Sequence, residues 1–303
     1  MIHQLLTVFS IGTLIYIGFS LAELALNRYK VRNLSLDDWI ADVGSVALSR
    51  WLVPPVVAVL TALLATRLFP GAAGTLAGTP VWVQFLAFLV FEDMVQYWYH
   101  RAVHTSPSLW PLHLGHHSAP YMGIRVAERN GFFYKILFPN HYTAGLLVYL
   151  GFGETFIWYA TIKGLVTAGA HSEVRWDAFL YRYRVLKPLA WIIQRTISTP
   201  ATHFAHHALH EGDGVGHYSG NFGALLFFWD VLFGTALISQ KYPAGFGVPE
   251  DPLLGYEPWY TQMFYPIFEP RIGIERQSGP RPPSVTATLG APRRLRRTKS
   301  AAV

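Results

Sequence analysis

Residues 5–26 read LLTVFSIGTLIYIGFSLAELAL, an apolar run in which Glu23 is the only charged residue. A helix needs about 20 mostly apolar residues to cross a bilayer, so this run predicts a membrane span. No basic segment precedes it, as one would in a secretory signal, and the first cations follow it at Arg28, Lys30 and Arg32. Because basic flanks stay in the cytoplasm, we expect an uncleaved anchor with its N-terminus outside.

Further apolar runs predict additional spans. Residues 51–69 and 81–99 each have the length of a span, and residues 134–151 and 152–170 suggest a hairpin that is broken around Gly151. Ionisable residues interrupt this hairpin, so a pair of re-entrant or interfacial helices remains an alternative for it. We expect an all-α, polytopic membrane protein with about four to five transmembrane helices and a cytoplasmic helical cap.

The composition supports a membrane protein. Hydrophobic residues make up 51% of the 303 residues, charged residues only 14%, and aromatic residues 15%. Soluble domains have roughly 25% charged residues, and aromatic rings are enriched at membrane–water interfaces. A single soluble globule is therefore disfavoured.

The basic charge of the chain is confined to its end. Residues 271–303 contain eight basic residues and one acidic residue, a net +7, which leaves −1 for residues 1–270 out of the total of +6. We expect this end to be disordered, either as a solvated tail or as a segment attracted to anionic lipids. A nucleic-acid-binding core, which needs a basic face on the fold itself, is disfavoured. Residues 174–198 mix apolar and basic residues and predict an amphipathic helix on the cytoplasmic interface.

Histidine is the residue type that points to chemistry. The chain has 13 histidines and no cysteine, which excludes disulfides, iron–sulfur clusters and thiolate zinc sites. Eight histidines fall into three tight groups: His100 and His104; His113, His116 and His117; His203, His206 and His207. Side chains three or four residues apart share a helix face, so each group should direct its imidazoles towards one point.

Imidazole suits iron, zinc, copper and nickel, and eight or nine imidazoles could supply two irons with about four ligands each. Isolated histidines are more often packing residues or pH switches. The HxxHH pattern, however, occurs twice here, at 113–117 and 203–207, and an HxxxH pattern at 100–104 precedes the first copy. This repetition favours a metal site.

The residues around these histidines resemble the fatty acid hydroxylase / sterol desaturase superfamily of integral-membrane di-iron enzymes. Residues 93–104 (DMVQYWYHRAVH) are similar to the family's first histidine box, and residues 109–118 (LWPLHLGHHS) to its second. Residues 198–207 (STPATHFAHH) resemble the third box, and residues 220–235 resemble the segment that closes the family domain. His171 matches a solitary histidine between boxes two and three.

The resemblance implies a set of ligands and cofactors. The metal ligands would be nine histidines: His100, His104, His113, His116, His117, His171, His203, His206 and His207. The cofactors would be two iron ions, for which zinc could substitute, together with O₂. Electrons would come from an external NAD(P)H-linked donor, through a ferredoxin or cytochrome b5-like carrier with its reductase.

The sequence departs from the family at two positions. Some members carry a second histidine where this chain has Thr167, four residues before the solitary one. The alkylglycerol monooxygenases carry a glutamate where this chain has Thr105.

Three residues outside the boxes are candidates for supporting the catalytic centre. Asp93 lies two helical turns before His100 and could orient an imidazole N–H or form an ion pair with Arg101 or Arg125. Asp230 could hold a ligand or cap a helix, and Asn221 could contact iron through water.

The remaining histidines have other expected roles. His210 and His217 should be surface or supporting residues, whereas His3 and His141 should be packing or interfacial residues.

The pattern leads to one functional hypothesis and two alternatives. The hypothesis is a membrane-bound di-iron oxidoreductase that uses O₂ to hydroxylate or desaturate a C–H bond of a sterol or fatty acyl lipid, in lipid biosynthesis. We expect residues 1–80 to form N-terminal transmembrane helices, residues 81–270 the catalytic domain and residues 271–303 the tail. The alternatives are a histidine-rich membrane metal transporter or metal-binding protein, and a zinc hydrolase. Transporters place ionisable groups near the middle of the bilayer, whereas these histidines follow the ends of the expected spans.

Overall fold

The computed structural model describes residues 2–29, 34–211, 213–248 and 257–270, and the predicted tail at 271–303 lies outside the described residues. The described part is helical, with only an isolated bridge between Ala208 and Phe246, which confirms the all-α prediction. The N-terminal elements are α1 (Ile2–Ala25), α2 (Leu36–Val46), η1 (Ala47–Leu52), α3 (Val53–Leu68), η2 (Pro70–Ala72), α4 (Val81–Phe88), η3 (Leu89–Met94), α5 (Val95–Thr105), α6 (Trp110–His117) and α7 (Ile124–Glu128). The later elements are α8 (Phe132–Leu137), α9 (Pro139–Leu147), η4 (Val148–Phe152), α10 (Gly153–His171), α11 (Ala178–Arg182), η5 (Arg184–Leu186), α12 (Lys187–Thr196), α13 (Pro200–His206), α14 (Phe228–Phe233) and α16 (Trp259–Phe264).

Long apolar helices form one part of the molecule. Among the described residues, three helices are long and apolar enough to cross a membrane, and they span Ile2–Ala25, Leu36–Leu68 and Pro139–His171. Apolar side chains such as Leu14 and Leu64 are more than half exposed on these helices, as lipid-facing residues would be. These helices support an integral membrane protein, and the predicted number of spans stays a prediction.

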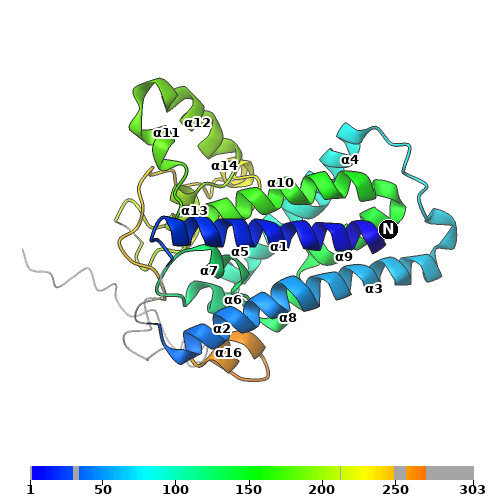
Figure 1. Ribbon diagram of the computed structural model, residues 1–303, viewed down its shortest axis with the longest axis horizontal. Helices are drawn as coiled ribbons and strands as arrows, with labels where there is room; N and C mark the ends of the chain where they lie inside the picture. The colour runs from blue at the N-terminus through cyan, green and yellow to red at the C-terminus, as the bar shows by residue number, and fades with distance from the viewer. Residues whose placement is uncertain (1, 30–33, 212, 249–256, 271–303) are drawn as a thin grey trace, which may run out of the picture.

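The predicted hairpin is present, and Gly151 forms its turn. Gly151 has a φ of 120°, and a side chain here would also meet the backbone of Ala77 at 2.7 Å, so only glycine fits. Helix α9 therefore ends near the N-terminus of the chain, and α10 returns alongside α1 to the opposite end (Figure 1).

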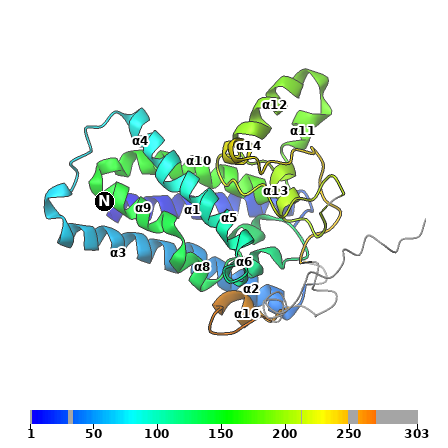
Figure 2. The same cartoon turned by 180° about the vertical axis from the view of Figure 1, so that it is seen from behind.

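The run at 81–99 forms a continuous helical segment with π-helical geometry in its middle. Figure 2 shows α4 and α5 following one another towards α6. The π-helical element η3 lies between them and carries Glu92 and Asp93, which are both buried. Such local widening of a helix is common at functional sites.

Short helices close the end of the molecule where α1 and α10 finish. Their packing relies on buried charges, since Arg129 contacts Asp38 at 2.8 Å and Asp42 at 3.2 Å, and Arg125 contacts Asp42 at 2.9 Å. Glu23, the single charge in α1, accepts hydrogen bonds from the backbone of Ile124 and Glu173. Buried charges must be paired in this way, so these contacts fix the end of α1 against the segments that carry the histidines.

The predicted amphipathic helix at 174–198 is wrong as a single helix. The structure has two short helices, α11 and α12, which project from the rest of the molecule (Figure 1). The chain is extended at Tyr183 between them. Pro188 lies in the first turn of α12, where proline is tolerated. Val185, Trp191 and Ile192 are each more than half exposed there.

Candidate metal centre

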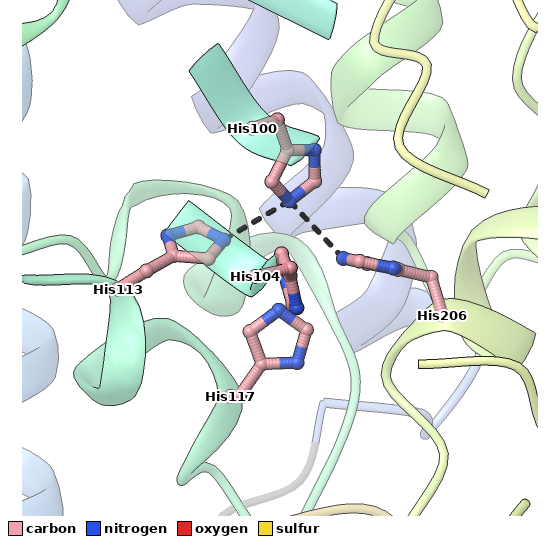
Figure 3. Close-up of side chains that lie close together, drawn as sticks. All are labelled: His100, His104, His113, His117 and His206. Carbon is pink, nitrogen blue, oxygen red and sulfur yellow. Dashed lines mark hydrogen bonds between the residues drawn. The ribbon is translucent and has the colours of Figure 1, made fainter. Parts of the chain in front are cut away.

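The structure brings the nine predicted histidines together into two groups. The first group contains His100, His104, His113, His117 and His206, and the second contains His116, His171, His203 and His207. Within each group, one ring nitrogen from every histidine lies within 4.8 Å of the others. Figure 3 shows the rings of the first group converging from separate helices. Eight of the nine side chains are buried and His104 is partly exposed.

The expectation that each box points to one place is wrong for the two HxxHH boxes. His113 and His117 enter the first group, whereas His116, between them, enters the second. The third box is divided in the opposite sense, with His203 and His207 in the second group and His206 in the first. Adjacent residues differ by about 100° around a helix axis, so i and i+4 share a face while the middle histidine points elsewhere. Each HxxHH box therefore serves both groups.

Helix α13 begins with a cap that sets the position of the third box. The Thr199 side chain accepts from the Thr202 backbone, and the Thr202 side chain accepts from the Thr199 backbone. Pro200 occupies the first turn, where its missing N–H costs nothing. This rigid start holds the following histidines in register.

The hydrogen bonds of two imidazoles fix the position of their protons. His100 Nδ1 lies 2.8 Å from the carbonyl oxygen of Phe222, and His206 Nδ1 lies 2.7 Å from that of Gly220. A carbonyl only accepts, so each Nδ1 carries a proton, and in a neutral ring Nε2 then presents a lone pair. The two Nε2 atoms are nevertheless only 3.1 Å apart. A hydrogen bond between them would require one ring to be doubly protonated.

Burial opposes such double protonation. It lowers the pKa of His100 to about 4 and holds the pKa of His206 well below 6.5. Neutral imidazoles with converging lone pairs are the form that binds metal ions. Other buried ring nitrogens of these groups have no hydrogen-bond partner among the described residues, as is the case for His113 Nδ1, His116 Nδ1, His117 Nε2 and His203 Nδ1. The donor set and its geometry thus fit bound metal ions.

The two carbonyls that orient the first group belong to residues 220–223, here called the carbonyl loop. Asn221 has a φ of 57°, and its side-chain amide donates to the backbone of Thr202 and Leu237. Asp230 accepts from the backbone N–H groups of Phe222 and Gly223 at 2.8 and 2.7 Å. Asp230 therefore holds the loop backbone directly, whereas Asn221 ties the loop to the backbone of Thr202 and Leu237, and neither side chain is hydrogen-bonded to an imidazole in the described part of the chain.

Asp93 supports the segment that follows the carbonyl loop. Its carboxylate accepts from the backbone of Leu225 and Leu226 and from Trp229 Nε1, at 2.9 to 3.1 Å. Lys163 Nζ lies 3.5 Å away. Asp93 thus contacts neither an imidazole nor the two arginines considered from the sequence. The supporting roles of Asp93, Asn221 and Asp230 remain predictions, and each would act through the carbonyl loop or the segments packed against it.

The other histidines lie outside both groups. His217 Nε2 is 3.2 Å from the carbonyl oxygen of Thr235, and its Nδ1 is 3.7 Å from Glu211. His210 is in the neighbouring loop, and His3 is exposed on α1.

His141, expected as a packing residue, lines a cavity of about 250 Å³ that also borders His100, His113, His116, His171 and His203. Sequence reasoning did not single out the polar residues of this cavity, such as Asn140 and Lys163. Their position within otherwise apolar runs could have identified them, because ionisable and polar residues in such runs are usually functional.

The fold and the two histidine groups define a helical protein with candidate membrane spans and two clusters that could hold metal ions. Residues 85–235 match the family model described as fatty acid hydroxylase. The chain therefore belongs to the fatty acid hydroxylase / sterol desaturase superfamily, as the histidine boxes predicted.

Curated relatives match the same region. The chain is 26% identical over 182 residues to an alkylglycerol monooxygenase of Xenopus tropicalis, covering 60% of this chain and 36% of that protein. It is 27% identical over 188 residues to a very-long-chain aldehyde decarbonylase of Oryza sativa subsp. indica, covering 55% of this chain and 58% of that protein. The chain thus spans between about a third and just over half of the length of these relatives. No solved structure matches the chain.

Proposed function

We propose that this protein is an iron-dependent membrane oxygenase that uses O₂ to hydroxylate or desaturate a lipid of the sterol or fatty acyl type. The observation that carries the proposal is the pair of facing Nε2 lone pairs of His100 and His206 within two groups of neutral imidazoles. The nine histidines would hold two iron ions, or zinc as a substitute, and iron would supply the activation of O₂. Family membership and the names of the relatives, a monooxygenase and a decarbonylase, support this chemistry.

The residues of the chain would hold the imidazoles and shelter the reaction from water. The carbonyl loop fixes two imidazoles of the first group, and the burial of the histidines keeps them neutral. Gly12, Ile15 and Tyr16 of helix α1 line the cavity beside the histidines. Because α1 is a candidate membrane span, this wall supports entry of a lipid from the bilayer without passage through water.

The orientation, the electron source and the division of the chain are parts of the same proposal. Cations after α1, and the exposed cations and aromatic rings of α12, support an active site and C-terminus in the cytoplasm and an N-terminus outside. There, a ferredoxin or cytochrome b5-like carrier and its reductase would deliver electrons from NAD(P)H. Residues 1–80 would act as an anchor, residues 81–270 as the catalytic domain and residues 271–303 as a tail.

Comparison of host lipids with and without the full chain tests the function. We expect a lipid that gains one oxygen atom or loses two hydrogen atoms, and its loss in the variant His206→Ala. His217→Ala is the matched control, since this histidine lies outside both groups. Unchanged lipids with the wild-type chain present would contradict the proposal. Movement of metal ions across the membrane of vesicles that contain the chain would instead favour the metal transporter.

A further inference from the structure

The cavity beside the histidines is more polar than an alkyl chain requires. Its walls include five charged side chains, of which Arg50 pairs with Glu128 and Lys163 pairs with Glu92. The fifth, Lys135, has no carboxylate within 4.0 Å in the described part of the chain. Pockets for purely apolar ligands are instead lined mostly by apolar side chains, with few polar groups.

Two asparagines of this cavity have acceptor atoms without a donor. Asn130 and Asn140 are 6% and 2% exposed, and the Oδ1 atom of each is buried with no hydrogen-bond partner in the part of the chain that the structure describes. The orientation of Asn140 is fixed, because its Nδ2 donates to the carbonyl oxygen of Glu92 at 2.8 Å. A buried acceptor without a hydrogen bond costs free energy of folding, so we expect both oxygens to accept hydrogen bonds from a bound molecule.

We infer that this cavity binds the polar end of a lipid that carries hydroxyl groups. A hydroxyl can donate to the oxygens of Asn130 and Asn140 and can also accept from an N–H of the Lys135 side chain. A free fatty acid carboxylate would satisfy Lys135 alone, since an ionised carboxylate has no proton to donate to the asparagines. The inference rests on the proposed function and narrows its substrate class. It places carbons near the hydroxyl groups, rather than the far end of the alkyl chain, beside the histidines.

Ligand binding by the purified, metal-loaded full chain tests this inference without turnover. The probes are the vicinal diol of hexadecane, its dimethyl ether and palmitate, and the measurement is the midpoint of thermal unfolding at matched concentrations. A ligand that binds only the folded state raises this midpoint. We expect the diol to bind at least about 10-fold more tightly than the ether, because the ether cannot donate to either asparagine oxygen.

Variants assign the preference to the asparagines. Asn130→Leu should reduce the advantage of the diol over the ether to less than about 3-fold. The matched control is Thr155→Val, which removes a buried hydrogen bond to Gln84 away from the cavity and should keep the preference. The inference is overturned if the ether or palmitate binds as tightly as the diol, if none of the probes binds, or if Asn130→Leu keeps the preference. Because oxidation of host lipids is a separate measurement, a chain that oxidises lipids but prefers palmitate would refute only this inference.

Discussion

The two histidine groups are held in different ways. In the first group, His100 and His206 donate to carbonyls of the carbonyl loop, which follows them by 122 and 14 residues in the chain. In the second group, His171 has a local partner, since its Nδ1 donates to the carbonyl oxygen of Thr167, one turn earlier on the same helix, at 2.7 Å. Distant contacts thus orient the first group, whereas helix geometry suffices for His171. The first group should therefore be more sensitive to changes outside the histidines.

The largest effect that separates the groups should come from Asp230→Asn. Asparagine has one acceptor oxygen, so it cannot hold the backbone N–H groups of Phe222 and Gly223 as both carboxylate oxygens now do. Loss of such a supporting partner typically lowers metal affinity by about 10- to 100-fold. We expect one of two bound metals to be lost at lower chelator concentration, as measured by elemental analysis of the purified chain.

Asp213→Asn is the matched control for this variant. Asp213 also accepts from two backbone N–H groups, at 2.8 Å each, but in a loop outside the histidine groups. It should leave both metals unchanged. Equal weakening of both metals by Asp230→Asn would show that the carbonyl loop does not serve the first group alone.

A smaller effect should follow from Asp93→Asn. Asp93 supports residues 225–229, which follow the carbonyl loop and do not themselves contact His100 or His206 through their carbonyls. We therefore expect a several-fold loss of metal affinity, again in the first group. Glu92→Gln tests the alternative that pairing with Lys163 is what matters, because Glu92 contacts the same ammonium but not this segment. If Glu92→Gln weakens the metal as much as Asp93→Asn, the loop explanation fails.

These contacts also mark the limit of what the sequence can predict. Helical spacing identified eight of the nine histidines, because ligands three or four residues apart are a local property of the chain, whereas the solitary His171 was identified only through the family resemblance. The distribution of the boxes between the groups depends on how α6 and α13 face each other, which no local pattern encodes. The partners of His100 and His206 are backbone carbonyls, which have no sequence signature. Asp93 was found because it lies two helical turns before His100, but its partners lie 132 to 136 residues away.

Acidification should not separate the groups, because burial controls protonation in both. It lowers the pKa of His100 to about 4 and those of His203 and His207 well below 6.5. Between pH 6.5 and 4 the unfolded chain therefore binds more protons than the folded chain, so stability present above 6.5 is lost as the pH falls. The unfolding midpoint should decline over this window, and both metals should be released together. Release of one metal well before the other would mean that the loop also controls protonation.

The smallest effect should come from Thr167→Val, at the position where some family members have a second histidine. The partner of His171 is the backbone carbonyl of this residue, and the Thr167 side chain donates to Lys163 on the same helix. Valine keeps the carbonyl and the shape, so metal affinity should change by less than about 2-fold, and stability by less than about 1 kcal/mol. A loss as large as that of Asp230→Asn would mean that the Thr167 hydroxyl itself serves the second group. Local helix geometry would then be insufficient there, and the contrast between the two groups would disappear.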